Sequence, residues 1–326
     1  MLLGADSRIK LGIYISRFIS ILFQQRLRKR IILGVHVAGA FESWSQMVEF
    51  LQFVRSAGRL PLQILLANAS LRRRLLFELK HNYYDELDLV IPLGCGLSCP
   101  LAFGEAWCSF AEIFLEEEYS PAFEIIPLPE RWIDLGCHAG FFSLFVAWRK
   151  ERSKQPTPSR ALLVDGDLRM EVPVRKMIDM NHFGGCMSFR HGLISDRDGE
   201  GIFVERPFMS SSACTPSRGG KLRSVPRLSV EEICLALAPP YDLIKVDVEG
   251  GEFELLLSYS DLLKSTRYLL LEWHSWHAGG GGKEQICAMA QEQGFAVIKE
   301  IVEGHAVSFE GSQASCGTLL FGRAAG

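Results

Sequence analysis

Charged and apolar residues alternate in IKVDVEGGEFELL, the stretch from Ile244 to Leu256. Its first half has the β-branched residues that buried parallel strands favour, interrupted by Lys245, Asp247 and Glu249. In a strand, this two-residue spacing places all three charges on one side. Because an unpaired buried charge is costly, the charged side must face partners or a cavity, where a carboxylate can position a substrate or accept a proton.

A second apolar run, LLLEWH at residues 269–274, ends in Glu272 and His274. If the two runs are neighbouring parallel strands, their carboxyl ends meet at one edge of the sheet. Asp247 is then the first candidate for positioning a substrate and for a general base, and Glu272 or His274 could share that work. The histidine has a suitable unperturbed pKa of about 6.5, although a histidine at a strand end is as often a structural hydrogen-bond partner.

Two other interpretations of these charges stay open. Lys245 and Asp247 could pair with each other within the strand, and Glu252 could complement the N-terminus of a following helix. A divalent metal held by Asp247, Glu249 and Glu272 is a further alternative, since oxygen ligands suit magnesium. The spacing of these three carboxylates does not establish their mutual geometry.

The stretch WIDLGCHAGFFSL, residues 132–144, has the order apolar strand, acidic residue, glycine turn and apolar helix. Open α/β sheets bind nucleotide-like ligands with this arrangement at the carboxyl ends of their strands. Gly136 and Gly140 do not have the GxGxxG spacing of a dinucleotide site, and the chain has no GxxxxGK[ST] motif. The turn therefore disfavours NAD and FAD, excludes a P-loop for ATP or GTP, and favours a ligand without a pyrophosphate.

S-adenosylmethionine is a ligand of this kind, with an adenosine, a sulfonium and a methionine end. Gly136 and Gly140 would let the backbone of the turn approach the methionine end, and Asp134 could bind its ammonium group directly or through water. A second acidic residue is expected after the next strand. The stretch ALLVDGD places Asp165 there, where its carboxylate could accept both ribose hydroxyls. Asp167 is better interpreted as a helix N-cap.

Five motifs, in this order, resemble those of the FkbM-type class I methyltransferases: WIDLGCHAGFFSL, LLVDGD, HGLISDRDGEGIFV (191–204), IKVDVEGGEFELL and LLLEWH. The resemblance covers about Glu105 to Gly322, and IKVDVEG is its most specific element. It implies an α/β, Rossmann-like fold with a seven-stranded, mostly parallel sheet whose last strand is antiparallel. It also implies methyl transfer from S-adenosylmethionine, usually to a hydroxyl of a sugar, glycan, glycolipid or polyketide.

The resemblance also assigns cofactor-binding residues. The glycine turn, with His138 inside it, and Asp165 would hold the cofactor, and Gly192 ends the third strand where class I methyltransferases place the adenine. Two departures are present, since family members commonly have Asn where His138 stands and Glu-Pro where Asp165-Gly166 stands. The second departure keeps the carboxylate, whereas the first changes a side chain at the cofactor.

After Pro121, short apolar runs alternate with helical segments, a pattern typical of βαβ units and a parallel sheet. The expected strands are Arg131–Leu135, Ala161–Val164, Ser188–Ile194, Asp242–Val248, Arg267–Trp273, Phe295–Ile301 and Thr318–Gly322. Ser229 and Glu232 are spaced as a capping box, and Gly294 is expected to close a helix that begins near Lys283. These elements would position the carboxylates and the glycine turn at one edge of the sheet.

The amino-terminal part of the chain differs from the rest. Residues 1–33 carry seven basic side chains and one acidic side chain, and helical patterns follow between residues 42 and 80. We therefore expect a basic, helical N-terminal extension over residues 1–104 and the methyltransferase domain over residues 105–326. The apolar segment 11–23 is too short for the roughly 20 residues that span a bilayer. As a basic amphipathic helix it could lie on a membrane surface or pack on the rest of the protein.

The composition is that of an ordinary soluble globular protein, with 326 residues of which 48% are hydrophobic and 22% are charged. The net charge of -3 offers no general electrostatic attraction to nucleic acid, so no nucleic-acid partner is expected. The nine cysteines are scattered without zinc-ligand spacing, and we interpret them as reduced thiols. A cytoplasmic protein is therefore expected, with peripheral membrane contact as a further hypothesis.

Three classes of function follow from these patterns. The first is an S-adenosylmethionine-dependent O-methyltransferase that acts on a small-molecule, glycan or lipid-linked acceptor. The second is a nicotinamide-dependent Rossmann enzyme, which the glycine spacing disfavours. The third is a non-catalytic, methyltransferase-like interaction module, against which the presence of Asp134, Asp165 and Asp247 argues.

Overall fold

The computed structural model describes residues 89–101, 106–154, 159–195, 199–205, 221–276, 281–309 and 312–323. Strands alternate with helices along most of this length. The strands are β1 (Leu89–Gly94), β2 (Leu97–Leu101), β3 (Arg131–Leu135), β4 (Arg160–Asp165), β5 (Met187–His191), β6 (Leu193–Ile194), β7 (Glu200–Glu205), β8 (Lys221–Leu228), β9 (Tyr241–Val246), β10 (Thr266–His274), β11 (Phe295–Phe309) and β12 (Ser312–Arg323). The α-helices are α5 (Ala106–Phe110), α6 (Ser120–Phe123), α7 (Phe141–Arg152), α8 (Glu171–Met180), α9 (Val230–Ala236), α10 (Glu252–Ser258), α11 (Ser260–Lys264) and α12 (Lys283–Glu292). A π-helical turn, η1 (Ala111–Leu115), and two short 3-10 helices, η2 (Leu168–Met170) and η3 (Phe183–Gly185), complete the described elements.

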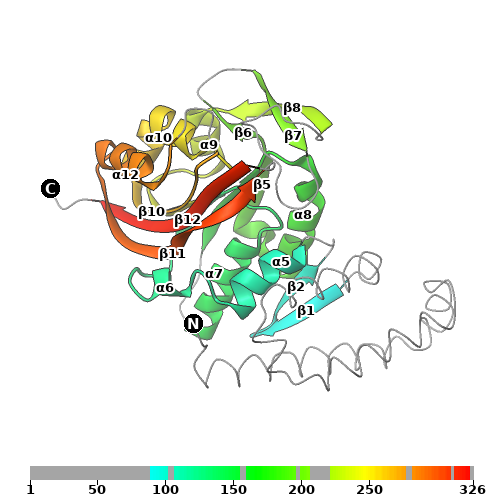
Figure 1. Cartoon of the computed structure of the whole chain (residues 1–326). Helices are drawn as coiled ribbons and strands as arrows, with labels where there is room; N and C mark the ends of the chain where they lie inside the picture. The colour runs from blue at the N-terminus through cyan, green and yellow to red at the C-terminus, as the bar shows by residue number, and fades with distance from the viewer. Residues whose placement is uncertain are drawn as a thin grey trace, which may run out of the picture. The chain divides into compact units, whose positions relative to one another are not determined.

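Seven strands form the central sheet, in the order β11-β12-β10-β9-β3-β4-β5 (Figure 1). Strands β5, β4, β3, β9 and β10 pair in parallel. Strand β12 lies between β10 and β11 and runs antiparallel to both. The expected α/β sheet of seven mostly parallel strands with an antiparallel last strand is confirmed.

The strand order reverses between β3 and β9. From β3 the chain adds β4 and β5 on one side, and it then returns to place β9 and β10 on the other side of β3. In open α/β sheets, such a reversal leaves a crevice at the carboxyl ends of the strands, where ligands bind. The segments that follow β3 and β9 therefore meet at this position.

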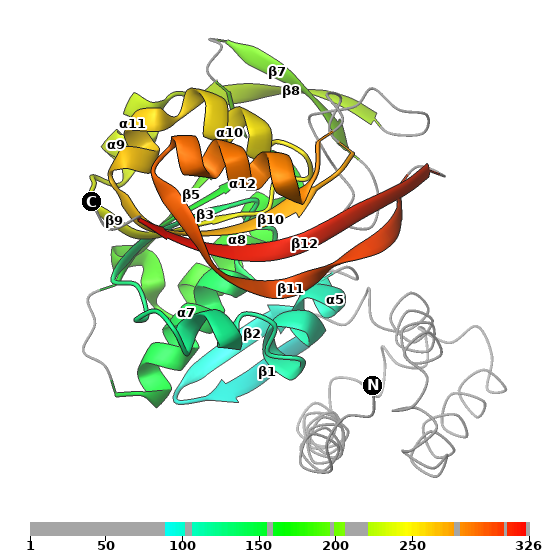
Figure 2. The same cartoon turned by 60° about the vertical axis from the view of Figure 1, so that its left-hand side comes forward.

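Helices cover both faces of the sheet (Figure 2). One face packs against α9, α10, α11 and α12, in a core that includes Ile133, Ile244 and Leu271 from the strands. The opposite face is covered by α7 and α8, with the ribbon of β1 and β2 beside them. Trp132 and Asp134 point to this second face, since both side chains contact Ser143 of α7. The buried Asp134 thus has α7 as its neighbour.

Several local predictions are confirmed. Strand β3 has the expected bounds, and the Ser229–Glu232 capping box is present at the start of α9, with both of its hydrogen bonds formed. The side chain of Asp167 accepts a hydrogen bond from the amide of Arg169 and caps η2. Gly294 follows α12 with a φ of 82°, a conformation that favours glycine at a helix end.

The third expected strand differs from the structure. Ser188–Ile194 is divided at Gly192, and the residues beyond it form β6, which pairs with β8 in a separate three-stranded sheet. The amide of Gly192 donates to the carbonyl of Asp165 at 2.9 Å, and a Cβ at this glycine would lie 2.5 Å from Leu228 Cγ. This close packing turns the chain out of the central sheet. Strands β11 and β12 are also longer than expected, because they continue as a hairpin beyond the central sheet (Figure 1).

Residues Leu89 to Gly326 form one compact unit of the chain, which includes β1 and β2. The division at residue 104, made from the sequence, stays a prediction. The basic segment 1–33 and the helical patterns between residues 42 and 80 lie outside the described residues. Among the helices that the structure describes, none has the length and apolar character needed to cross a membrane.

Candidate active site

The glycine turn after β3 is tightly packed. Gly136 has a φ of 71° and Gly140 a φ of 77°, both in the left-handed region that glycine adopts most readily. A Cβ at Gly136 would lie 1.6 Å from the carbonyl oxygen of Asp247, and a Cβ at Gly140 would lie 2.6 Å from Met177 Cε. Backbone atoms leave no room for a side chain at Gly136, and the positive φ favours glycine at Gly140. The turn thus brings its main chain against Asp247, the residue that follows β9.

Asp134, the acidic residue before the turn, is fully buried. Its Oδ2 accepts a hydrogen bond from Ser143 Oγ at 2.8 Å, and Lys245 Nζ lies 3.7 Å from its Oδ1. Among the described residues, that Oδ1 atom has no hydrogen-bond partner. Burial raises the pKa of the Asp134 carboxyl, whereas Lys245 and Ser143 act in the opposite direction. The contact expected between Asp134 and a ligand ammonium stays a prediction, and in the structure the nearby cation is Lys245.

Asp165 lies at the carboxyl end of β4, beside the turn. Its Oδ2 accepts from the amide of His138 at 2.7 Å, and its Oδ1 accepts from the amide of Asp167 at 2.8 Å. Burial raises the pKa of this carboxyl to about 7, and the two amide hydrogen bonds act against the rise. Because each oxygen can accept a second hydrogen bond, the carboxylate can hold two ligand hydroxyls.

His138 is the residue that departs from the FkbM-type pattern. It has a φ of 48°, and its Nδ1 lies 3.1 Å from Ser109 Oγ, so α5 helps to hold the turn. Gly192, expected at the adenine, follows β5 at the same edge of the sheet, and His191 Nε2 lies 3.1 Å from the carbonyl of Gly166. The structure thus gathers the turn, Asp165 and Gly192 around one edge.

Lys245 connects the two halves of the site. It pairs with Asp134 in the register of β9 and β3, and it is 5% exposed. Its Nζ donates to the Gly136 carbonyl at 3.0 Å and to Asp247 Oδ2 at 3.1 Å. Burial alone would lower the pKa of the Lys245 ammonium, but the charges of Asp247 and Asp134 raise it above its ordinary value. The lysine is therefore a buried cation that joins the glycine turn to the strand β9.

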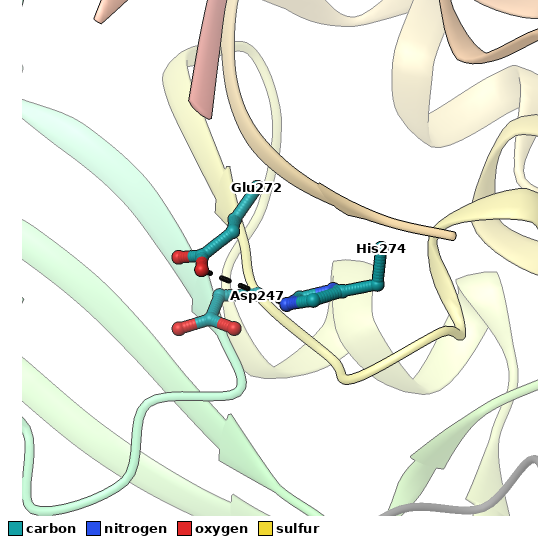
Figure 3. Close-up of side chains that lie close together, drawn as sticks. All are labelled: Asp247, Glu272 and His274. Atoms are coloured by element: carbon teal, nitrogen blue, oxygen red, sulfur yellow. Dashed lines mark ion pairs between the residues drawn. The ribbon is translucent and has the colours of Figure 1, made fainter. Parts of the chain in front are cut away.

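The three residues expected to be catalytic lie together (Figure 3). One ligand atom from each of Asp247, Glu272 and His274 lies within 4.8 Å of the others. Asp247 comes directly after β9, and Glu272 and His274 end β10, which pairs with β9 in parallel. The carboxylate side chains of Asp247 and Glu272 are 27% and 25% exposed, whereas the His274 side chain is 2% exposed. The cluster is open to solvent on its carboxylate side.

Charge determines the protonation of this cluster. Burial would raise the pKa of Asp247, but Lys245 and His274 outweigh it and hold the pKa below the ordinary value. Burial would lower the pKa of His274, but Glu252, Glu272 and Glu249 raise it well above 6.5. At neutral pH the structure therefore has an ionised Asp247 next to a positively charged imidazole.

Glu252 fixes the orientation of that imidazole. Its Oε1 lies 2.8 Å from His274 Nδ1 and also accepts from the amides of Val248 and Gly250 at 3.3 Å and 3.1 Å. Glu252 is the first residue of α10, the helix N-terminus expected for it from the sequence, and it also contacts His274 of the cluster. Glu249 occupies the turn with a φ of 52°, and burial raises its pKa to about 8.

Glu118 is a residue that the sequence did not single out. It lies between η1 and α6, and burial, followed by the charges of Glu272, Glu112 and Asp247, raises its pKa to about 8. These charges act on Glu118 only because its segment folds over the carboxyl edge of the sheet. The three consecutive glutamates at residues 116–118 were the only sequence feature that could have indicated Glu118. A run of acidic residues usually lies on a solvent-exposed face, so it does not by itself indicate a site.

Aromatic residues also border the cluster. The ring centroids of His274 and Trp276 are 4.3 Å apart, and Trp276 Nε1 donates to the carbonyl of Glu249 at 3.3 Å. Trp273 points to the opposite face of the sheet and belongs to its core. An aromatic side chain at the site is thus supplied by Trp276, from the segment directly after β10.

No known family model matches the chain, and no curated protein matches it. Solved structures with a similar fold do match. The chain is 14% identical to the magnesium protoporphyrin IX methyltransferase ChlM from Synechocystis PCC 6803, solved with bound SAM, with a TM-score of 0.38 over 68% of this chain and 80% of that one. It is 10% identical to TehB from Haemophilus influenzae, with a TM-score of 0.41 over 66% of each chain. It is also 10% identical to the M1A22 tRNA methyltransferase TrmK of B. subtilis, with a TM-score of 0.36 over 64% of this chain and 66% of that one.

These similarities concern the fold alone. The expectation that the net charge excludes nucleic acid is nevertheless wrong, because the structures similar to this chain include a tRNA methyltransferase. A whole-chain charge of -3 does not describe how charges are distributed over a surface. The strand order and the antiparallel β12 give this chain the Rossmann-like fold of the class I S-adenosylmethionine-dependent methyltransferases.

Proposed function

We propose that this protein transfers a methyl group from S-adenosylmethionine to a hydroxyl group of a sugar, glycan, glycolipid or polyketide-type acceptor. The observation that carries the proposal is the position of Asp247. Its main chain packs against Gly136 of the cofactor-type turn, and its carboxylate lies with Glu272 and His274 at the open edge of the sheet. One residue thus joins the expected cofactor side to the expected acceptor side.

The residues present fit the cofactor. The left-handed Gly136 and Gly140 give the turn the tight conformation that brings its main chain to the edge where the methionine end is expected, and the carboxylate of Asp165 can accept the ribose hydroxyls. Lys245 holds the turn by donating to the Gly136 carbonyl. Asp134, just before the turn, is held by a hydrogen bond from Ser143 of α7. When bound, S-adenosylmethionine supplies an electrophilic methyl carbon on its sulfonium.

The acceptor side needs a group that holds a hydroxyl and takes its proton. Because Lys245 and His274 keep its carboxylate ionised, Asp247 can accept the hydrogen bond and then the proton of the hydroxyl, although its lowered pKa makes it a weaker base than an ordinary carboxylate. Glu272 lies beside it and can accept a second hydrogen bond from the acceptor. The buried imidazole of His274, held by Glu252, stabilises the negative charge of both carboxylates.

The sequence motifs support a hydroxyl as the acceptor. IKVDVEG and LLLEWH, which resemble FkbM-type methyltransferases, contain Asp247, Glu272 and His274. These residues form the cluster just described, and an unactivated hydroxyl is the acceptor that most needs a carboxylate base. The FkbM-type assignment, like the choice of oxygen as the methylated atom, is part of the proposal.

The cofactor is tested by calorimetric titration of the purified protein with S-adenosylmethionine and, separately, with NAD(H). We expect micromolar binding of S-adenosylmethionine that Asp165→Ala weakens at least tenfold, or about 1.4 kcal/mol. Asp179→Ala, an exposed carboxylate on α8, is the matched control and should bind as the wild type does. Binding of NAD(H) alone would make the chain a nicotinamide enzyme, and binding of neither ligand by folded protein would favour an interaction module.

The transfer step is tested with S-adenosylmethionine labelled at its methyl group. We expect label to enter a hydroxyl-rich metabolite and lipid extract, and Asp247→Asn to reduce the rate at least about 100-fold while cofactor binding persists. Total tRNA is the parallel substrate. Label that enters tRNA and not the extract would replace the proposed acceptor class with nucleic acid.

A further inference from the structure

We propose that Asp247, Glu272 and His274 hold a divalent cation at the open edge of the sheet. The ligand atoms of the three side chains lie within 4.8 Å of one another, a spacing at which one ion can contact all three. Figure 3 shows the two carboxylates and the imidazole directed toward one another from the ends of β9 and β10. The set differs from the three carboxylates considered in the sequence, because His274 takes the place of Glu249.

The buried imidazole is the independent observation that points to a ligand. His274 is 2% exposed, and its Nδ1 is held by Glu252 Oε1 at 2.8 Å. Its Nε2 is directed into the cluster, where it forms ion pairs with Glu272 Oε1 at 3.6 Å and Glu249 Oε2 at 4.0 Å, and a divalent ion bound there would take the place of the Nε2 proton. A carboxylate that holds one ring nitrogen while the other faces the site is the arrangement that orients metal-binding histidines.

The surrounding groups also suit a cation. The carboxyl groups of Glu249 and Glu252 lie 4.0 Å and 2.8 Å from the ring nitrogens of His274, so further oxygen donors surround the cluster. Lys245 contacts the Oδ2 atom of Asp247. Among the described residues, it forms no ion pair with Glu272 within 4 Å. The carboxylates of Asp247 and Glu272 therefore have a solvent-facing side where an ion can bind.

The donor set indicates the class of ion. Two carboxylates and one imidazole suit Mn²⁺ or Zn²⁺ better than Mg²⁺ or Ca²⁺, which prefer oxygen ligands alone. Three protein ligands leave coordination positions for water or for an acceptor oxygen. A role of the ion in orienting the acceptor hydroxyl rests on the proposed function, whereas binding of the ion does not.

The test is titration of the full chain, stripped with a chelator, with Mn²⁺ followed by electron paramagnetic resonance, in the absence of any methyl donor. We expect one Mn²⁺ per chain, and Asp247→Asn, Glu272→Gln and His274→Gln should each weaken its binding at least about tenfold. Glu303→Gln changes an exposed glutamate of β11 and should leave binding unchanged. Parallel titrations with Mg²⁺ and Zn²⁺ establish the preference, and binding of Mg²⁺ at least as tight as that of Mn²⁺ would contradict the imidazole ligand.

A spectroscopic signature separates ligation from a loss of folding. The spin-echo modulation of bound Mn²⁺ should show coupling to one imidazole nitrogen in the wild type, and the coupling should be absent in His274→Gln. Mn²⁺ that binds with no nitrogen coupling, or that binds all three variants with the wild-type affinity, overturns the site. Methyl transfer that continues in excess chelator by a protein unable to bind Mn²⁺ overturns the ion and keeps the proposed function. Mn²⁺ binding by a protein that never binds S-adenosylmethionine keeps the ion site and overturns the proposed function.

Discussion

The main chains of Gly136 and Asp247 are in direct contact: a Cβ added to the glycine would lie 1.6 Å from the aspartate carbonyl oxygen. The two residues come from different motifs, and they meet because β3 and β9 are neighbouring parallel strands. The amide of Asp247 also donates to the carbonyl of Leu135 at 3.0 Å, so the contact is part of the sheet edge. The glycine turn and the acidic cluster consequently form one site.

Gly136→Ala should therefore disrupt this site. We expect a loss of about 1–3 kcal/mol in the free energy of unfolding from the strained φ of 71°, with a further loss from the clash with Asp247. Urea denaturation measures the loss, and calorimetry should show that S-adenosylmethionine binding is lost as well. Gly184→Ala is the control, because a Cβ there would meet no atom within 4 Å. Equal stability of the two variants would contradict the close contact.

Lys245→Met should leave the carboxylates of Asp134 and Asp247 without their shared cation. Removal of one partner from a buried ion pair typically costs about 3–5 kcal/mol, and we expect a loss of that order in chemical denaturation. The second substitution Asp134→Asn in the Lys245→Met background should restore part of the loss, since it removes a buried charge. Lys264→Met, in an exposed pair with Asp261, should change stability by less than about 0.5 kcal/mol. No recovery in the double variant would argue against the pairing with Asp134.

The pKa of Asp165 predicts a pH dependence of stability. The folded-state pKa is about 7 and the ordinary value is 3.8, so between these pH values the folded protein binds a proton that the unfolded chain has released. The free energy of unfolding should thus fall as the pH rises through this window and then level off. In Asp165→Asn this fall is absent, and its stability relative to the wild type should increase by at least about 1 kcal/mol between pH 4 and pH 7.5.

Denaturant unfolding of the ligand-free proteins across this pH range provides the measurement. The comparison uses the change in the free energy of unfolding with pH and not its value at one pH. Asparagine changes the hydrogen bonds with the amides of His138 and Asp167 at every pH, which shifts that value. Parallel curves for the two proteins would show that the carboxyl is not protonated in the folded state at pH 5 to 6.

Tyr259→Phe should loosen the small sheet of β6, β7 and β8. The Tyr259 hydroxyl accepts from the amide of Ser195 at 2.8 Å and contacts the carbonyls of Ser195 and Leu228. We expect a loss of about 1–3 kcal/mol, because partners of a buried hydroxyl are left unsatisfied. Hydrogen exchange should become faster in β8 before it does in β9. Tyr268→Phe, on the partly exposed part of β10, is the control and should have little effect.

Much of the central sheet could be predicted from the sequence. The bounds of β3, the capping box at Ser229 and the N-cap at Asp167 depend on neighbouring residues, so local patterns are sufficient to identify them. The motifs also indicated that Asp247, Glu272 and His274 lie at the carboxyl ends of adjacent strands. Their order along the chain predicted that they would meet, because the carboxyl ends of parallel strands lie at one edge.

Tertiary structure alone determined the chemistry of these residues. The two-residue period of a strand shows which side chains share a face, but not which strand or helix lies opposite. Lys245 faces Asp134 because β9 pairs with β3, Glu252 reaches His274 because α10 starts beside β10, and Glu118 was not identified because its segment is distant in sequence. The protonation of Asp165 and His274 follows from burial and from charges on other elements, which a pattern of residue types does not contain.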